Sequence, residues 1–242
     1  MKKYAILSII LFLSQVSLAQ LYKESQDVVI QDENGKVLEY GLAGGLNQPQ
    51  FSNMDVDGDG KKDLVVFDRS GSKLLVFISQ TTGGQISYMF DPSYEEFFPE
   101  AKGFLVLKDY NDDGKEDVWL FTHDSLELYQ NNSTSTLAFD LKAKLIAYDH
   151  VNPSSFNPFK KLSPIRGSFP AIYDIDGDKD IDFISNLNVN GSNMIFNKNV
   201  SVDSGQALED IEYEIIDKCY GGLAEENFNV ILNAECIFAI EK

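Results

Sequence analysis

Short apolar runs bounded by polar turns recur along most of this chain. Three of them are each followed, after a turn rich in Gly, Asn, Asp or Ser, by a second run. They are 64–67, 118–121 and 182–184, followed by 73–78, 126–129 and 193–196. Paired runs of this length are typical of β-hairpins. The runs are apolar on both faces, as in strands that are buried on both sides, and the sequence therefore predicts an all-β fold.

Few segments interrupt this pattern. Only residues 94–102 and 224–228 approach helical periodicity, and we expect each to form a loop or a single turn. Residues 152–167 contain three prolines, which predicts an irregular loop before the third pair of runs.

An acidic motif lies directly before the first strand of each pair. It reads D-V-D-G-D-G-K-K-D at 55–63, D-Y-N-D-D-G-K-E-D at 109–117 and D-I-D-G-D-K-D-I-D at 174–182. The motifs begin 54 and 65 residues apart and hold 14 of the 38 acidic residues. Since each interval fits one antiparallel blade of four strands, we expect β-propeller-type repeat blades, about three, in an incomplete ring.

Oxygen-bearing side chains at positions one, three, five and nine of each motif suit a hard cation. Calcium takes six to eight oxygen ligands, and alternate carboxylates in a curled loop can converge on it. The expected side-chain ligands are Asp55, Asp57, Asp59 and Asp63, then Asp109, Asn111, Asp113 and Asp117, then Asp174, Asp176, Asp178 and Asp182. The backbone carbonyls at position seven, those of Lys61, Lys115 and Asp180, are further expected ligands. The sequence thus predicts about three structural Ca²⁺ ions.

Position six should bend sharply, and glycine suits such a bend because it has no side chain. Gly60 and Gly114 occupy it in the first two motifs, whereas the third has Lys179. An EF-hand is excluded because position twelve is Val66, Leu120 or Ser185 instead of glutamate, and because strands flank the loops. Ordinary acidic hairpin turns are the alternative, which the matched register of three motifs disfavours.

The net charge and the N-terminal sequence limit the partners that this chain can have. A formal net charge of −18 argues against nucleic acid as a partner, because nucleic-acid binding depends on Lys and Arg. Residues 1–19 have two lysines, an apolar run and small residues before Gln20, which predicts a secretory signal peptide and an exported protein. No later run is long enough to predict a transmembrane segment.

The chain has two cysteines, Cys219 and Cys236. In an exported protein a disulfide between them is the natural interpretation, and two buried free thiols are the alternative. A zinc site is not supported, because there is no Cys-x-x-Cys motif and there are only two histidines.

On the three acidic motifs and their flanking strands, the chain resembles the FG-GAP/VCBS repeat family, which includes the calcium-bearing blades of integrin α-subunits and exported proteins of Bacteroidetes. The resemblance spans roughly residues 45–236, after lead-in strands at 20–44, and implies calcium ligation by the residues named above. It also implies a ring of four or more blades. Three motifs fall short of that number unless the N-terminal strands complete a blade, so the resemblance leaves open whether the chain belongs to a longer propeller.

These features together favour a non-enzymatic secreted or cell-surface protein, a binding or adhesion scaffold for an extracellular protein or glycan. Neither G-x-S-x-G nor H-E-x-x-H occurs, and the repeated carboxylates are assigned to metal. Two alternatives stay open: an exported propeller-type polysaccharide hydrolase or lyase, and a purely architectural component of a surface assembly.

Overall fold

A computed structural model describes residues 29–38, 40–41, 43–123, 125–155, 157–162, 169–186, 193–226 and 229–233. The chain divides into two compact units, Met1–Gly41 and Leu42–Lys242. In the first unit the described residues form a turn closed by a single antiparallel bridge between Gln31 and Val37. The predicted signal peptide, residues 1–19, lies outside the described residues.

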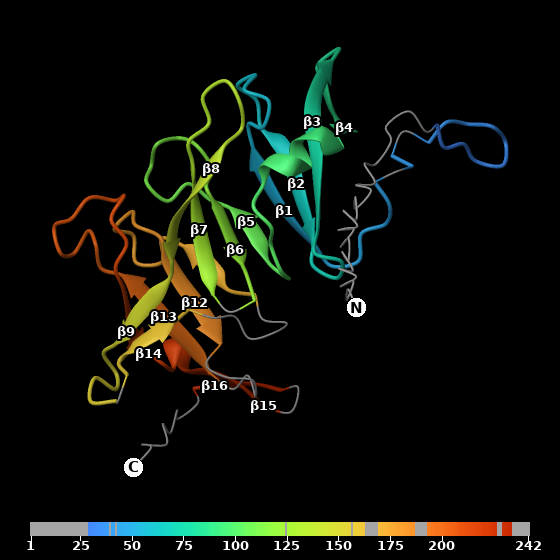
Figure 1. The fold of residues 1–242 in the computed structure, drawn as a ribbon. Coiled ribbons are helices and arrows are strands. Elements are labelled where there is room, and N and C mark those ends of the chain that lie inside the picture. Colours follow the sequence, from blue (N-terminus) through green and yellow to red (C-terminus); the bar gives the residue numbers. More distant parts are fainter. Residues whose placement is uncertain are drawn as a thin grey trace, which may run out of the picture. The chain divides into compact units, whose positions relative to one another are not determined.

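The second unit is built of β-strands, which confirms the predicted all-β class (Figure 1). Its first sheet has the order β1-β2-β3-β4, and its second has the order β5-β6-β7-β8. The strands of the first sheet are β1 (Pro49–Met54), β2 (Asp63–Asp68), β3 (Lys73–Thr82) and β4 (Gln85–Phe90). Those of the second are β5 (Leu105–Leu107), β6 (Val118–Phe121), β7 (Leu126–Asn131) and β8 (Phe139–Lys144).

A third sheet has six strands in the order β10-β9-β14-β13-β12-β11. They are β9 (Ile146–Asp149), β10 (Phe159–Lys161), β11 (Ala171–Tyr173), β12 (Asp182–Asn186), β13 (Met194–Asn199) and β14 (Tyr213–Asp217). Strands β15 (Leu223–Glu226) and β16 (Asn229–Leu232) form a separate hairpin. None of the sheets formed by the described strands is closed into a barrel.

The two-sided apolar pattern of the strands follows from how the sheets pack. In β6, Val118 and Leu120 belong to a core cluster shared with the first sheet, whereas Trp119 and Phe121 belong to a cluster shared with the third sheet. All four side chains are at most 3% exposed. Because successive residues of a strand point to opposite faces, β6 is buried on both sides.

The first strands of the first two sheets lie side by side. The backbone N–H of Leu105 donates to Gln50 Oε1 at 3.2 Å, and that of Leu107 donates to Ser52 Oγ at 3.1 Å. These side chains satisfy donors on the outer edge of β5, which would otherwise be unpaired. The contact fixes β5 next to β1.

Two local expectations were wrong. Within the expected loop 152–167, Phe159–Lys161 forms β10, which pairs with β9, and β9 pairs in parallel with β14. Within 224–228, Leu223–Glu226 forms β15 and pairs with β16. In both cases the strand is defined by hydrogen bonds to a partner strand, which local periodicity does not reveal. Residues Pro92–Phe97, which overlap the start of the other expected loop or turn at 94–102, form a short 3-10 helix.

Candidate metal-binding loops

The three acidic motifs occupy the same place in their sheets. Each connects an edge strand to the strand that pairs with it: β1 to β2, β5 to β6 and β11 to β12. At position six, Gly60, Gly114 and Lys179 all have positive φ angles, of 83°, 85° and 83°. The third loop therefore makes the same bend as the other two, although a lysine in this region of φ is strained.

The aspartate at position one holds this bend in each loop. Its Oδ2 accepts the backbone N–H of the residue at position six, at 2.9 Å for Asp55, 2.8 Å for Asp109 and 3.1 Å for Asp174. A short side chain that accepts backbone N–H groups ahead of it is a common way to close a tight turn. The loops are thus curled by their own backbone and first carboxylate.

The aspartate at position nine links each loop to the next strand but one after it, which is β3, β7 or β13. Asp117 Oδ2 accepts the N–H of Tyr110 at 2.9 Å, and its Oδ1 accepts the N–H of Asn131, in β7, at 2.8 Å. The same pair of bonds joins Asp63 to Val56 and Ser79, and Asp182 to Ile175 and Asn199. All three aspartates are at most 1% exposed. This second role of position nine was missed by sequence reasoning.

In two of the three loops the carboxylates also converge. Oxygens of Asp55, Asp57 and Asp63 lie within 4.8 Å of one another, as do oxygens of Asp174, Asp176 and Asp182. Such groups could hold a metal ion. The fifth-position Asp59 lies outside the first group and pairs with Lys61 Nζ at 2.7 Å.

In the second loop, the described acidic residues form no group of three carboxylates with oxygens this close together. Its third position is the neutral Asn111, whose buried Oδ1 has no hydrogen-bond partner. An unpartnered buried oxygen at a predicted ligand position could bind a metal ion. Lys62 of the first loop and Glu116 of the second form an ion pair at 2.5 Å.

Burial makes several of these carboxyl groups hard to ionise. It raises the pKa of Asp117 and of Asp182 to about 6, an effect that backbone hydrogen bonds oppose and neighbouring carboxylates reinforce. Burial and Asp178 together raise the pKa of Asp180 to about 7. A bound cation favours the charged form of nearby carboxylates, so it would relieve this cost.

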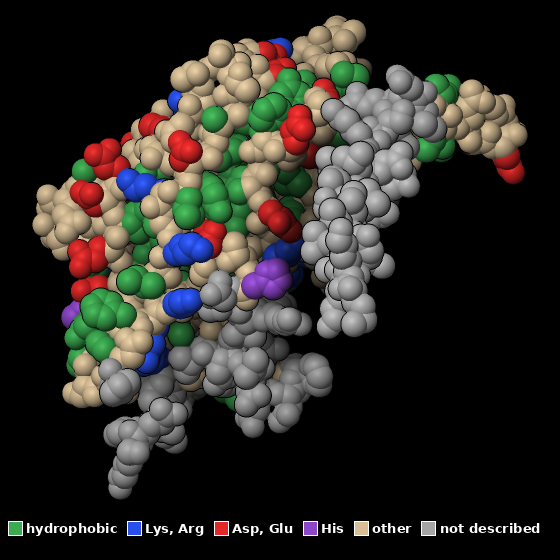
Figure 2. Space-filling model, in the orientation of Figure 1, with side chains coloured by type: hydrophobic (Ala, Val, Ile, Leu, Met, Phe, Trp, Pro, Cys, Tyr) green, Lys and Arg blue, Asp and Glu red, His purple; other side chains and the backbone are tan. Residues whose placement is uncertain are grey.

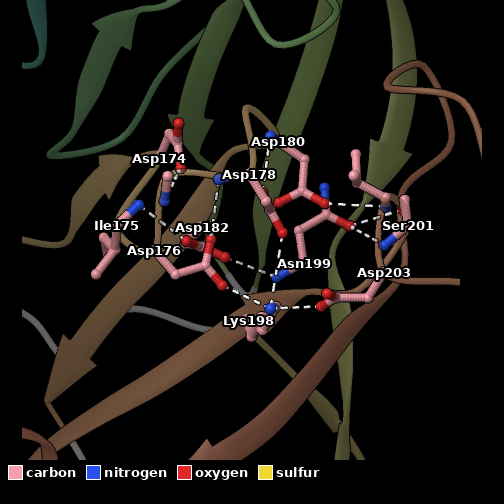
Figure 3. Close-up of polar contacts among 12 residues, drawn as sticks. Asp174, Ile175, Asp176, Asp178, Asp180, Asp182, Lys198, Asn199, Ser201 and Asp203 are labelled. Carbon is pink, nitrogen blue, oxygen red and sulfur yellow. Dashed lines mark hydrogen bonds and ion pairs between the residues drawn. The ribbon is translucent and has the colours of Figure 1, made fainter. Parts of the chain in front are cut away.

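The third loop contains a feature that sequence reasoning missed (Figure 3). Lys198, from β13, reaches the loop and places Nζ 2.5 Å from Asp176 Oδ2 and 3.6 Å from Asp178 Oδ2. It also pairs with Asp203, which follows β13. Oxygens of Asp176, Asp178 and Asp203 form a further acidic group within 4.8 Å. Hydrogen bonds from Lys198 to Asp176 and Asp203 raise the pKa of the lysine above its usual value.

A separate cavity of about 280 Å³ is lined by residues of β9, β10, β12, β13 and β14 and by residues next to these strands. Three lysines, Lys160, Lys161 and Lys218, are among its lining residues. Lys218 Nζ pairs at 2.7 Å with the buried Asp149. This concentration of lysine differs from the acidic balance of the whole chain.

The other predicted features lie partly outside the described residues. Cys219 directly precedes the short 3-10 helix Tyr220–Gly222, but Cys236 lies outside the described residues, so their pairing stays a prediction.

Acidic side chains are spread over the face shown in Figure 2, with Lys and Arg side chains among them. In the part of the chain that the structure describes, no helix is long and apolar enough to cross a membrane.

Comparison with known proteins gives no match to a family model, to a curated protein or to a solved structure. The resemblance to FG-GAP/VCBS repeats therefore stays a prediction from the acidic motifs and the strands expected to flank them.

Proposed function

We propose that the chain is an exported calcium-binding β-repeat protein, of the FG-GAP/VCBS type, that acts as a binding scaffold for an extracellular protein or glycan. In this proposal calcium is structural, and the protein is not an enzyme. The three larger sheets are successive blades of a propeller-type array, and the strands β9 and β10 are an addition to the third blade.

The observation that carries the proposal is the equivalence of the three loops. Each curls around its first aspartate, bends through a positive φ at position six and returns a buried aspartate at position nine to the third strand. Three loops that share all these features favour one common role over three unrelated acidic turns. Convergent carboxylates in a pre-curled loop suit the oxygen preference of calcium.

The lysine-lined cavity is the first place to look for a ligand. Lys218 is already paired with Asp149. The exposed Lys160 and Lys161, however, favour a partner with carboxylate or sulfate groups, such as an acidic glycan, because opposite charges attract. Calcium would act on this site indirectly, by holding β12 and β13 in place through Asp182.

The proposed function is tested on a glycan array that includes neutral, uronate-containing and sulfated sugars, probed with the exported chain in calcium and in chelator. We expect binding to acidic glycans in calcium and its loss in chelator. The double variant Lys160→Gln/Lys161→Gln should reduce this binding. Glycan cleavage by the pure protein would instead favour the hydrolase or lyase alternative.

A further inference from the structure

The ammonium group of Lys198 lies at the third acidic loop, where a bound cation would be expected. Its side chain is 17% exposed, and its ammonium group lies among carboxylates of Asp176, Asp178 and Asp203 (Figure 3). Asp176 belongs both to this group and to the group with Asp174 and Asp182. A metal ion that uses Asp176 must therefore compete with the lysine for the same carboxylate.

The equivalent positions in the other two loops carry no charge. Ser79, Asn131 and Asn199 are structurally equivalent, because each donates its backbone N–H to the aspartate at position nine. The residues directly before them are Ile78, Gln130 and Lys198. Only the third loop thus has a lysine at this position of its third strand.

Asp203 is equally specific to the third repeat. It lies four residues after Asn199, and the corresponding residues in the first and second repeats are Gly83 and Ser135. Asp203 holds Lys198 from the side opposite the loop, as Figure 3 shows. The lysine is therefore fixed by a carboxylate outside the motif and directed toward those within it.

A second observation shows that the carboxylates of this loop are gathered more tightly than one ammonium group can satisfy. Asp180 is fully buried, and its Oδ1 has no hydrogen-bond partner. The buried Asp178 Oδ2 also has no hydrogen-bond partner, and its nearest cation is Lys198 Nζ at 3.6 Å. Two carboxyl groups placed this way are stabilised by a nearby cation or by a proton shared between them.

We propose that Lys198 is the resident cation of the third loop, so that the first two loops take calcium tightly and the third takes it only when the lysine is displaced. This proposal rests on the calcium-binding function proposed above. It predicts two tight calcium ions per chain instead of three. It also makes the third repeat the one whose fold depends least on calcium.

The test counts calcium ions by isothermal titration of the whole exported chain. Wild-type protein should bind two equivalents tightly, and Lys198→Met should gain a third equivalent with at least about tenfold tighter binding than the third loop of the wild type, since it removes a competing positive charge. Lys218→Met is the matched control. It removes another lysine that is 15% exposed and paired with a buried aspartate, but lies away from the loops, and it should leave the count at two.

The reciprocal variant keeps the proposal testable if Lys198→Met does not fold. Gln130 is half-buried and polar, so the double variant Gln130→Lys/Ser135→Asp introduces the same cation beside the second loop, together with the equivalent of the carboxylate that holds Lys198. Tight binding should fall from two equivalents to one, whereas Gln130→Met should keep both.

The possible results separate the two proposals. Three tight equivalents in the wild type, or no gain in a folded Lys198→Met protein, would overturn the role of Lys198 and leave calcium binding intact. Absence of calcium binding in the wild type with one equivalent gained by Lys198→Met would overturn the proposed function and retain the role of Lys198.

Discussion

The carboxylate of Asp117 accepts the backbone N–H of Asn131 at 2.8 Å, and this bond ties the second acidic loop to the third strand of its sheet. The same aspartate accepts the N–H of Tyr110 within the loop. Position nine therefore has a structural role that does not depend on any ion. Its aspartate is buried, and both of its oxygens accept backbone donors.

Asp117→Asn should destabilise the protein even in chelator. The asparagine NH₂ group cannot accept either backbone N–H, so one buried donor loses its partner at a cost of about 1–3 kcal/mol. Urea unfolding in chelator measures this. The control is Asp113→Asn, at the exposed fifth position, which should lower calcium binding but change the unfolding free energy in chelator by less than about 0.5 kcal/mol. Equal effects of the two variants in chelator would contradict this assignment.

The metal-free protein should lose stability as the pH rises from about 4 to about 7. The pKa values of Asp117 and Asp182 in the folded protein are about 6, above the value of about 3.9 for an exposed aspartate. Between these values the folded state binds more protons than the unfolded state, so each pH increase favours unfolding, by on the order of 1–3 kcal/mol per carboxyl in total.

Calcium should abolish this fall, because it stabilises the charged carboxylates. Urea unfolding at pH 4.5, 6 and 7.5, in calcium and in chelator, provides the measurement. A metal-free protein that becomes more stable across this range would show that burial does not control these groups.

The bend at position six offers a stabilising substitution. Lys179 has a φ of 83°, a conformation that glycine adopts without strain. Lys179→Gly should therefore raise the unfolding free energy by up to about 1 kcal/mol, after the entropy that glycine adds to the unfolded chain is included. Gly60→Ala is the converse. No atom lies within 4 Å of the added methyl, so a loss of about 1 kcal/mol would reflect the backbone alone. A destabilised Lys179→Gly protein would mean that the lysine side chain supports the loop.

The strands and the loops could be predicted because their signals are local. The apolar runs at 64–67 and 118–121 lie in β2 and β6, and three acidic motifs in one register are visible without a structure. The pairing of β9 with β14 could not be predicted, because it joins segments more than sixty residues apart through backbone bonds. Lys198 was missed for a similar reason. It reaches the third loop from a strand whose own sequence shows no metal-binding pattern.

Removing the third-position ligand from each loop should rank the sites. The first loop has four aspartates at its ligand positions and Gly60 at the bend, whereas the third has Lys179 at the bend and Lys198 among its carboxylates. Asp57→Ala should therefore remove the tightest phase of a calcium titration, and Asn111→Ala the next. Asp176→Ala should leave both tight phases in place. A tightest phase that survives in Asp57→Ala would reverse the ranking.

Calcium bound by the acidic loops should stabilise the fold. Differential scanning calorimetry of the exported chain, in about 1 mM calcium and in chelator, tests this most directly. Without a cation the carboxylates of each loop repel one another, which lowers the stability of the folded state. We predict a melting temperature that is higher in calcium by about 10 °C or more, with magnesium at the same concentration giving a smaller increase. Identical melting temperatures in calcium and in chelator would contradict the account.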